Sequence, residues 1–76
     1  RSYGLNQRFG DAVRACIESI GRNPLAFRAR HRDVRVAYTK VFPYGVYFVL
    51  HPNKNEVTIL AILHNKRAPE TVLRRL

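Results

Sequence analysis

Four side chains could take part in the cleavage of RNA: Arg35, Lys40, His64 and Arg67. Such cleavage needs a base to deprotonate the 2′-hydroxyl, cations to stabilise the phosphorane, and an acid to protonate the leaving oxygen. Arginine and lysine suit the second role, and histidine suits the first or the third. The same residues also fit a structural interpretation, with Arg35 and Lys40 as solvated strand residues and His64 as a hydrogen-bonded residue at a strand end. We favour the structural interpretation.

Other reaction types find little support in the sequence. His31, His51 and His64 are scattered, and the single cysteine, Cys16, has no second thiol at a zinc-binding spacing. Neither serine lies in a strained turn of the kind that exposes a nucleophile. The glycines are isolated, so no phosphate-binding loop is predicted. We therefore predict no metal site and no cofactor.

The charge balance of the chain is strongly positive. There are 14 lysines and arginines against 5 aspartates and glutamates, a net charge of +9. The imbalance points to an anionic partner, either a nucleic acid or an acidic protein, and solubility alone is the competing explanation. The densest cluster of cations, which we assign to contacts with such a partner, comprises Arg28, Arg30, Arg32 and Arg35.

The length of 76 residues allows one domain, residues 1–76, with a small core. No apolar run approaches the roughly 20 residues of a membrane span, and the N-terminus does not resemble a signal peptide. A lone cysteine is typical of a protein in a reducing compartment. We therefore predict a cytoplasmic protein without a membrane association, with Cys16 as an ordinary core residue.

The hydrophobic pattern predicts a helix near each end of the chain. Apolar residues recur every three or four positions over residues 5–20, as in an amphipathic helix, and Gly21 and Pro24 suit its end. Pro69 suits the first turn of a short C-terminal helix over residues 70–76.

The region between these helices predicts three strands, over residues 34–41, 45–50 and 56–63. Apolar residues occupy both faces of the last strand, so we expect it to be central and covered on both sides. One helix covers only one face, so we expect a partner to complete the covering layer. The expected fold is α+β: an N-terminal helix packed on a three-stranded antiparallel β-meander with a short C-terminal helix.

Two phrases of the sequence carry a family resemblance through their order and spacing. They are FPYxVYF at residues 42–48 and ILAILHxxRxP at residues 59–69. Over residues 5–70 the chain resembles the RelE/ParE toxin superfamily, and the fold would be a truncated form of that of the family. The resemblance implies a small toxin of a bacterial type II toxin–antitoxin system. It also implies an acidic antitoxin that covers the apolar grooves and the basic face of the toxin.

The resemblance implies one of two activities. RelE-like members cleave mRNA on the ribosome with an arginine and lysines, and the matching positions here are Gly45, Val36 and Tyr38, none of which carries a positive charge. ParE-like members lack this set and inhibit DNA gyrase. The resemblance therefore favours a gyrase-binding toxin over an enzyme. A ribosome-dependent endoribonuclease and a non-toxic, toxin-derived binding module stay open as alternatives. The residues assigned to the target contact are His64, Arg67, Arg74 and Arg75.

The front of the chain departs from the family pattern. Family members begin with a strand and a first helix, whereas this chain begins within or just before the second helix and contains no methionine. We therefore expect the domain to be incomplete at its N-terminus, with an exposed sheet edge. An exposed edge favours pairing between copies, and we predict a homo-oligomer.

Overall fold

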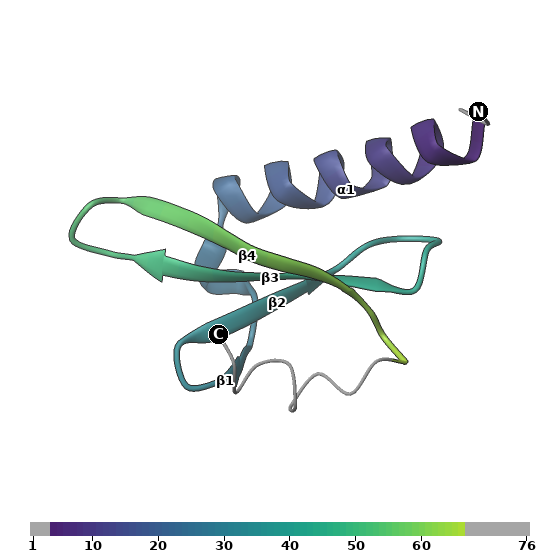
Figure 1. The fold of residues 1–76 in the computed structure, drawn as a ribbon. Coiled ribbons are helices and arrows are strands. Elements are labelled where there is room, and N and C mark those ends of the chain that lie inside the picture. Colours follow the sequence, from purple (N-terminus) through teal and green to yellow (C-terminus); the bar gives the residue numbers. More distant parts are fainter. Residues whose placement is uncertain (1–3, 67–76) are drawn as a thin grey trace.

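The computed structural model describes residues 4–66, where one helix is followed by a four-stranded antiparallel sheet (Figure 1). The helix α1 spans Gly4–Arg22, and a single 3-10 turn, η1, spans Pro24–Ala26. The strands, in sheet order, are β1 (Ala29–His31), β2 (Val34–Tyr38), β3 (Tyr44–His51) and β4 (Glu56–His64). The predicted α+β class and N-terminal helix are confirmed. The predicted helix over residues 70–76 lies outside the described residues.

Helix α1 crosses one face of the sheet with its apolar side inward (Figure 1). Cys16 and Ile20 lie four positions apart, on the same side of the helix, and keep only 8% and 1% of their surface exposed. The Cys16 Sγ–H donates a hydrogen bond to the carbonyl oxygen of Ala37 on β2, at 3.5 Å. Pro24, which follows the helix, has no N–H with which to continue the helical hydrogen bonds. The helix therefore ends where the sequence predicts.

The turn between β3 and β4 follows the prediction, whereas the turn between β2 and β3 begins earlier than predicted, because β2 ends at Tyr38 and not at residue 41. In residues 39–43 the Thr39 hydroxyl donates to the carbonyl oxygen of Phe42 at 2.5 Å and closes the turn. In residues 52–55 the chain reverses with Asn55 in the left-handed region, at φ 54°. Asparagine tolerates this conformation better than most residues, so the polar cluster between the two strands forms a turn.

The sheet contains one strand more than the sequence analysis predicted. β1 is only three residues long and pairs antiparallel with β2, with Ala29 opposite Arg35 and His31 opposite Val34. Its residues show no alternation of apolar and polar side chains. The strand therefore forms because the backbone of β2 offers hydrogen-bond partners, which a hydrophobic pattern does not reveal.

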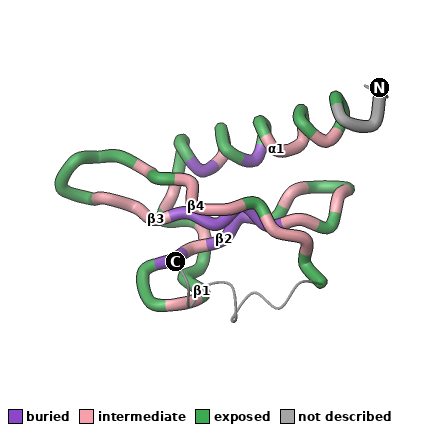
Figure 2. Tube along the Cα trace, viewed as in Figure 1, coloured by how far each residue is buried: buried purple, intermediate pink, exposed green. Residues whose placement is uncertain are grey.

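The central positions in the sheet belong to β2 and β3. The prediction that the last strand is central was wrong, because β4 lies at one edge of the sheet formed by the described residues. The run from Gly45 to Phe48 in β3 is buried throughout, whereas no residue of β4 is buried (Figure 2). Apolar residues on both faces of a strand indicate contacts above and below it, but they do not determine which strands lie beside it.

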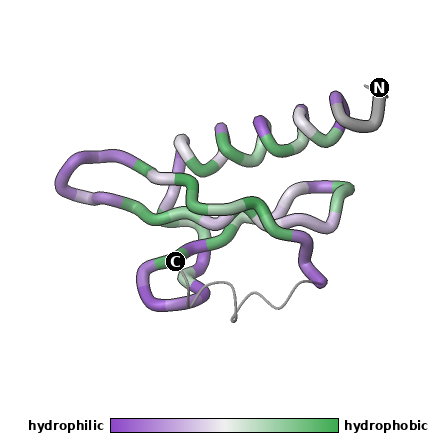
Figure 3. The backbone as a smooth tube through the Cα atoms, viewed as in Figure 1, coloured by the Kyte–Doolittle hydropathy of each residue, from purple (hydrophilic) through white to green (hydrophobic). Residues whose placement is uncertain are grey.

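Strand β3 separates two apolar clusters. The cluster under α1 comprises Cys16, Ile20, Ala37, Val46 and Phe48. The cluster on the opposite face comprises Val34, Val36 and Tyr47, with Val49, Leu60 and Leu63 against it. Figure 3 shows hydrophobic residues along β3 and β4 and hydrophilic residues in the turn between them. The core therefore lies on both faces of the sheet rather than under the helix alone.

Two buried groups are expected to make the protein less stable at alkaline pH. Burial raises the pKa of the Cys16 thiol above its ordinary value of 9.0. Burial also raises the pKa of the Tyr47 phenol above 10.0, with Tyr38 acting in the same direction and Arg30 against it. As the pH rises through 9.0, the unfolded chain therefore loses protons that the folded chain keeps. The free energy of unfolding then falls with rising pH.

Urea unfolding at a series of pH values measures this effect. We expect the midpoint to decrease as the pH rises from 9.0 to above 10.0. The decrease should be shallower in Cys16→Ala and in Tyr47→Phe, and shallowest in the double variant. A double variant with the pH dependence of the parent protein would contradict the assignment.

Candidate functional site

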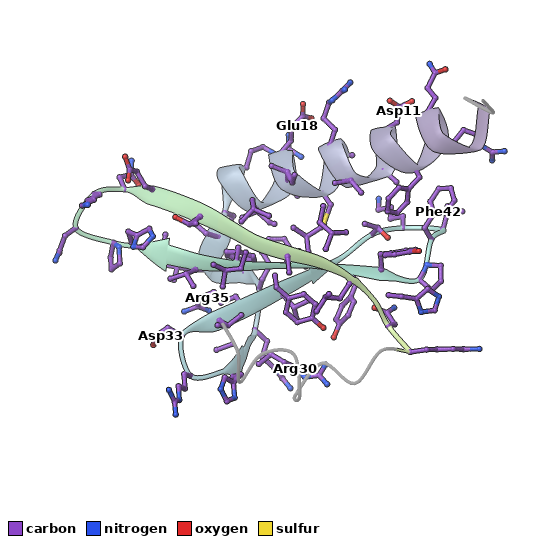
Figure 4. The ribbon with its side chains drawn as sticks, viewed as in Figure 1. Asp11, Glu18, Arg30, Asp33, Arg35 and Phe42 are labelled. Atoms are coloured by element: carbon purple, nitrogen blue, oxygen red, sulfur yellow. The ribbon has the colours of Figure 1, made fainter. Side chains whose placement is uncertain are left out.

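An arginine edge, defined as Arg28, Arg30 and Arg32, lies along β1 at the outer side of the sheet. All of these side chains are exposed. Among the described residues the only ion pair joins Arg14 to Asp11, at 3.9 Å, so no described carboxylate forms an ion pair with the arginine edge. Figure 4 shows Asp11 on the outer side of α1 and Arg30 on the opposite side of the sheet. The structure thus brings these predicted binding residues together as a positively charged edge.

Arg35, the fourth arginine of the predicted cluster, has a structural contact. Its side chain is half-buried, and Nη1 donates to the carbonyl oxygen of Phe27 at 2.7 Å. Phe27 follows η1, and its ring lies edge-on against Phe48 at a centroid distance of 6.0 Å. Arg35 therefore fastens the segment after η1 to β2. A hydrogen bond from a charged donor of this kind contributes about 1.5–3 kcal/mol.

His64 belongs to an aromatic cluster at the other end of the sheet, with Phe9, Phe42 and Tyr44. Its ring meets Tyr44 at a centroid distance of 5.0 Å, and Phe9 contacts Tyr44 at 4.7 Å and Phe42 at 5.5 Å. The backbone N–H of Lys66 donates to His64 Nδ1 at 3.0 Å. Nδ1 is therefore occupied as an acceptor, and in the neutral ring the proton lies on Nε2.

Val41 is a surface residue that the sequence analysis missed. The predicted strand ran to this residue, but β2 ends at Tyr38, and Val41 adopts φ 72° with 88% of its surface exposed. A β-branched residue rarely adopts such a φ, because its side chain clashes with the backbone. Lys40 lies beside it and is also exposed. In the sequence, only the nearby Pro43 indicated that the strand could end early.

Arg35 and His64, two of the candidate catalytic side chains, lie far apart on the sheet. Arg35 lies opposite Phe48 on β3, whereas His64 lies opposite Tyr44. Four residues of strand separate these positions, roughly 13 Å at 3.3 Å per residue. Lys40 lies in the turn between β2 and β3, and Arg67 lies outside the described residues. A general base and a cation that act on one phosphate must lie within hydrogen-bond reach of it, so Arg35 and His64 do not form such a pair.

Gly45 is closely surrounded by its neighbours, with no space for a side chain. A Cβ at this position would lie 2.9 Å from Cγ2 of Val36. It would also lie 3.2 Å from Cε1 of Tyr47 and 3.3 Å from Cε1 of Tyr38, the residue directly opposite Gly45 on β2. The positions that match the cationic residues of the nuclease branch are thus packed against one another, and none of them carries a charge.

No group of three or more His, Cys, Asp or Glu side chains that could hold a metal ion occurs among residues 4–66. In the same part of the chain no helix has the length and the apolar character needed to cross a membrane.

The fold and the site define a small basic α+β protein with a charged edge and an aromatic cluster at the far end of its sheet. The family model of the ParE toxin of type II toxin–antitoxin systems, parDE, matches residues 2–69. The chain therefore belongs to the ParE toxin family, within the RelE/ParE superfamily, as its sequence phrases predicted. Comparisons with curated proteins and with solved structures returned no match.

The packing around Gly45 leads to a prediction about stability. Replacement by alanine forces its neighbours apart, and overpacking of this kind costs about 1–3 kcal/mol. Gly10 is the matched control, because it lies within α1 and nothing lies within 4 Å of a Cβ at that position. We expect Gly45→Ala to lower the free energy of unfolding and Gly10→Ala to raise it by about 0.5–1 kcal/mol. Thermal or urea unfolding measures both, and equal effects of the two substitutions would contradict the close packing.

Proposed function

We propose that this protein is a ParE-like toxin that binds and inhibits DNA gyrase in the cytoplasm and is neutralised by an acidic antitoxin. Its membership of the ParE toxin family supports the toxin role and an antitoxin partner. The observation that favours gyrase binding over RNA cleavage is the packing at Gly45, where Val36, Tyr38 and Tyr47 leave no room for a cationic side chain. A toxin without a cation at this position would act through contacts with its target.

The two ends of the sheet suit different partners. The arginine edge offers exposed cations without described carboxylate partners, which suits an acidic segment of an antitoxin. The aromatic cluster around His64 and the exposed Val41 offer apolar surface at the opposite end, which suits a protein target. Arg67, Arg74 and Arg75, also assigned to the target contact, lie outside the described residues.

The competing function is ribosome-dependent endoribonuclease activity. It requires that Arg35, Lys40 or His64 contact one scissile phosphate. In that case primer extension on mRNA from cells that express the protein would show cleavage within codons in the ribosomal A site. A binding module without toxicity would cause no growth arrest at all.

A supercoiling assay with purified gyrase tests the proposed function directly. We expect the protein to arrest growth on expression and to inhibit supercoiling in vitro, with mRNA left intact. Truncation of a residue at the centre of a protein interface weakens binding by about tenfold or more, so His64→Ala should weaken the inhibition accordingly.

His51→Ala is the matched control for His64→Ala. His51 is half-buried at the opposite end of β3, where Nε2 lies 2.9 Å from the Thr58 hydroxyl, and it was not assigned to any contact. Inhibition should be similar in His51→Ala and the parent protein. Growth arrest together with unimpaired supercoiling would overturn gyrase as the target.

We also propose that copies of this chain associate through the edge of β4. This strand is nine residues long and carries no charged side chain between Val57 and Leu63. Charged residues and short length are the usual protection of an edge strand against pairing with another chain. β1, at the other edge, has both features, because it is three residues long and carries Arg30. The homo-oligomer should therefore form at β4.

Sedimentation velocity measures this association. We expect a dimer at micromolar concentration, and a monomer after Ile62→Lys, since a lysine on the exposed edge opposes strand pairing. Val41→Lys adds the same charge in an exposed turn and should leave the dimer intact. A monomeric parent protein would exclude the proposed edge pairing.

A further inference from the structure

A hollow beside β1 combines cations with an exposed aromatic ring. Its volume is about 480 Å³, and its lining residues are Ala26, Phe27, Arg28, Arg30, Val36 and Tyr38. Small-molecule pockets in proteins range from about 300 to 1,000 Å³, so the hollow is large enough to hold one nucleotide. We call it the Tyr38 hollow.

The cations of the Tyr38 hollow are arranged for an anion. Arg30 Nη1 donates to the Tyr38 hydroxyl at 2.8 Å, and this contact holds the guanidinium beside the ring. The remaining N–H groups of Arg30 point to no described carboxylate, and Arg28 is exposed in the same hollow. Two arginines without acidic partners match a phosphate group better than any neutral ligand, because guanidinium and phosphate form paired hydrogen bonds.

The ring of Tyr38 is held in place from behind. It lies opposite Gly45, at whose position a Cβ would be only 3.3 Å from Tyr38 Cε1. The buried Tyr47 lies close by, since Tyr38 and Arg30 both influence the pKa of its phenol. Tyr38 nevertheless keeps 49% of its surface exposed. An aromatic ring that is fixed on one side and open to solvent on the other is a platform for stacking.

These features select among the anions that the hollow could bind. An acidic peptide would use the arginines but would gain little from the ring. A nucleic-acid duplex would present phosphates but keep its bases stacked inside. A single strand presents phosphates and unstacked bases together, and each base can stack on an aromatic side chain.

We propose that the Tyr38 hollow binds one nucleotide of a single-stranded nucleic acid, with the base on Tyr38 and the phosphate on Arg28 and Arg30. The proposal is for binding alone, with no bond formed or broken. This binding goes beyond the inhibition of gyrase by protein contact and does not depend on it.

Fluorescence anisotropy with a labelled oligothymidine of about ten nucleotides tests the proposal. We expect binding that weakens steeply between about 50 and 200 mM salt, and weaker binding of a duplex of the same length. The double variant Arg28→Gln with Arg30→Gln should bind at least about tenfold more weakly, with a salt slope smaller by about 0.7 for the one lost phosphate contact.

The matched control removes the same charge elsewhere. Arg8→Gln with Lys54→Gln replaces two exposed cations, one on α1 and one in the turn between β3 and β4. We expect the affinity of this control to fall by less than about threefold. The two substitutions remove no direct contact with the oligonucleotide and reduce only the long-range electrostatic attraction, which salt screens. Equal losses in the two double variants would overturn the proposal and leave only general electrostatic attraction.

Two substitutions of Tyr38 separate stacking from the orientation of Arg30. Tyr38→Leu removes the ring and should weaken binding by about 5- to 150-fold, the range for one lost base–aromatic contact. Tyr38→Phe keeps the ring and removes only the hydroxyl that Arg30 contacts, so most of the affinity should remain. Unchanged binding by a folded Tyr38→Leu protein, verified by its thermal unfolding curve, would exclude the stacked base.

The same reaction mixtures distinguish this proposal from the proposed function. Electrophoresis should show the oligonucleotide intact after incubation, and its cleavage would contradict binding without chemistry. A protein that fails to inhibit gyrase but binds the single strand through the Tyr38 hollow would overturn the gyrase target alone. Gyrase inhibition without single-strand binding would overturn the Tyr38 hollow alone.

Discussion

The buried strand β3 is the constraint on which the rest of the structure depends. Its residues must fill an apolar layer under α1 and a second layer on the opposite face, and Val46, Tyr47 and Phe48 keep at most 1% of their surface exposed. Full burial of one large apolar side chain contributes about 1.5–3 kcal/mol. This is a large fraction of the free energy of unfolding of a domain this small. The protein therefore has little freedom to change β3 for a functional purpose.

Gly45 shows the functional consequence of this constraint. The strand that supplies the core also passes through the region where, by family resemblance, a catalytic arginine would be required. In this protein the space is filled by Val36 and the rings of Tyr38 and Tyr47, so a charged side chain does not fit there. The positive charge is found instead on β1, where exposed arginines do not compete with the core. Stability and electrostatic recognition thus occupy different strands of one sheet.

The two edges of the sheet differ for a related reason. β1 is short and carries Arg30, two features that protect its free edge from pairing with a strand of another chain. β4 is long, its side chains pack against both clusters of the core, and it carries no charged residue between Val57 and Leu63. Of the two edges, β4 is therefore the one without the features that usually protect an edge strand.

Much of the fold could be predicted because it depends on local patterns. Helical spacing placed Cys16 and Ile20 on the inner side of α1, and the polar cluster at residues 52–55 marked the turn between β3 and β4. Strand β1 could not be predicted in this way, since its three residues are held by backbone pairing and not by an apolar pattern. The order of the strands was likewise hidden, because apolar side chains on β3 and on β4 look alike in the sequence.

The sequence by itself determined the α+β class, the family and the positive charge, since these follow from composition, periodicity and the order of short phrases. Only the tertiary structure decided what each charged or aromatic residue can do. In that structure Arg35 donates a hydrogen bond to Phe27 and lies far from His64, and Arg30 lies beside Tyr38. The physical reason is that a hydrogen bond or a stacking contact depends on distances of a few ångströms between strands, and spacing along one strand does not specify its neighbours.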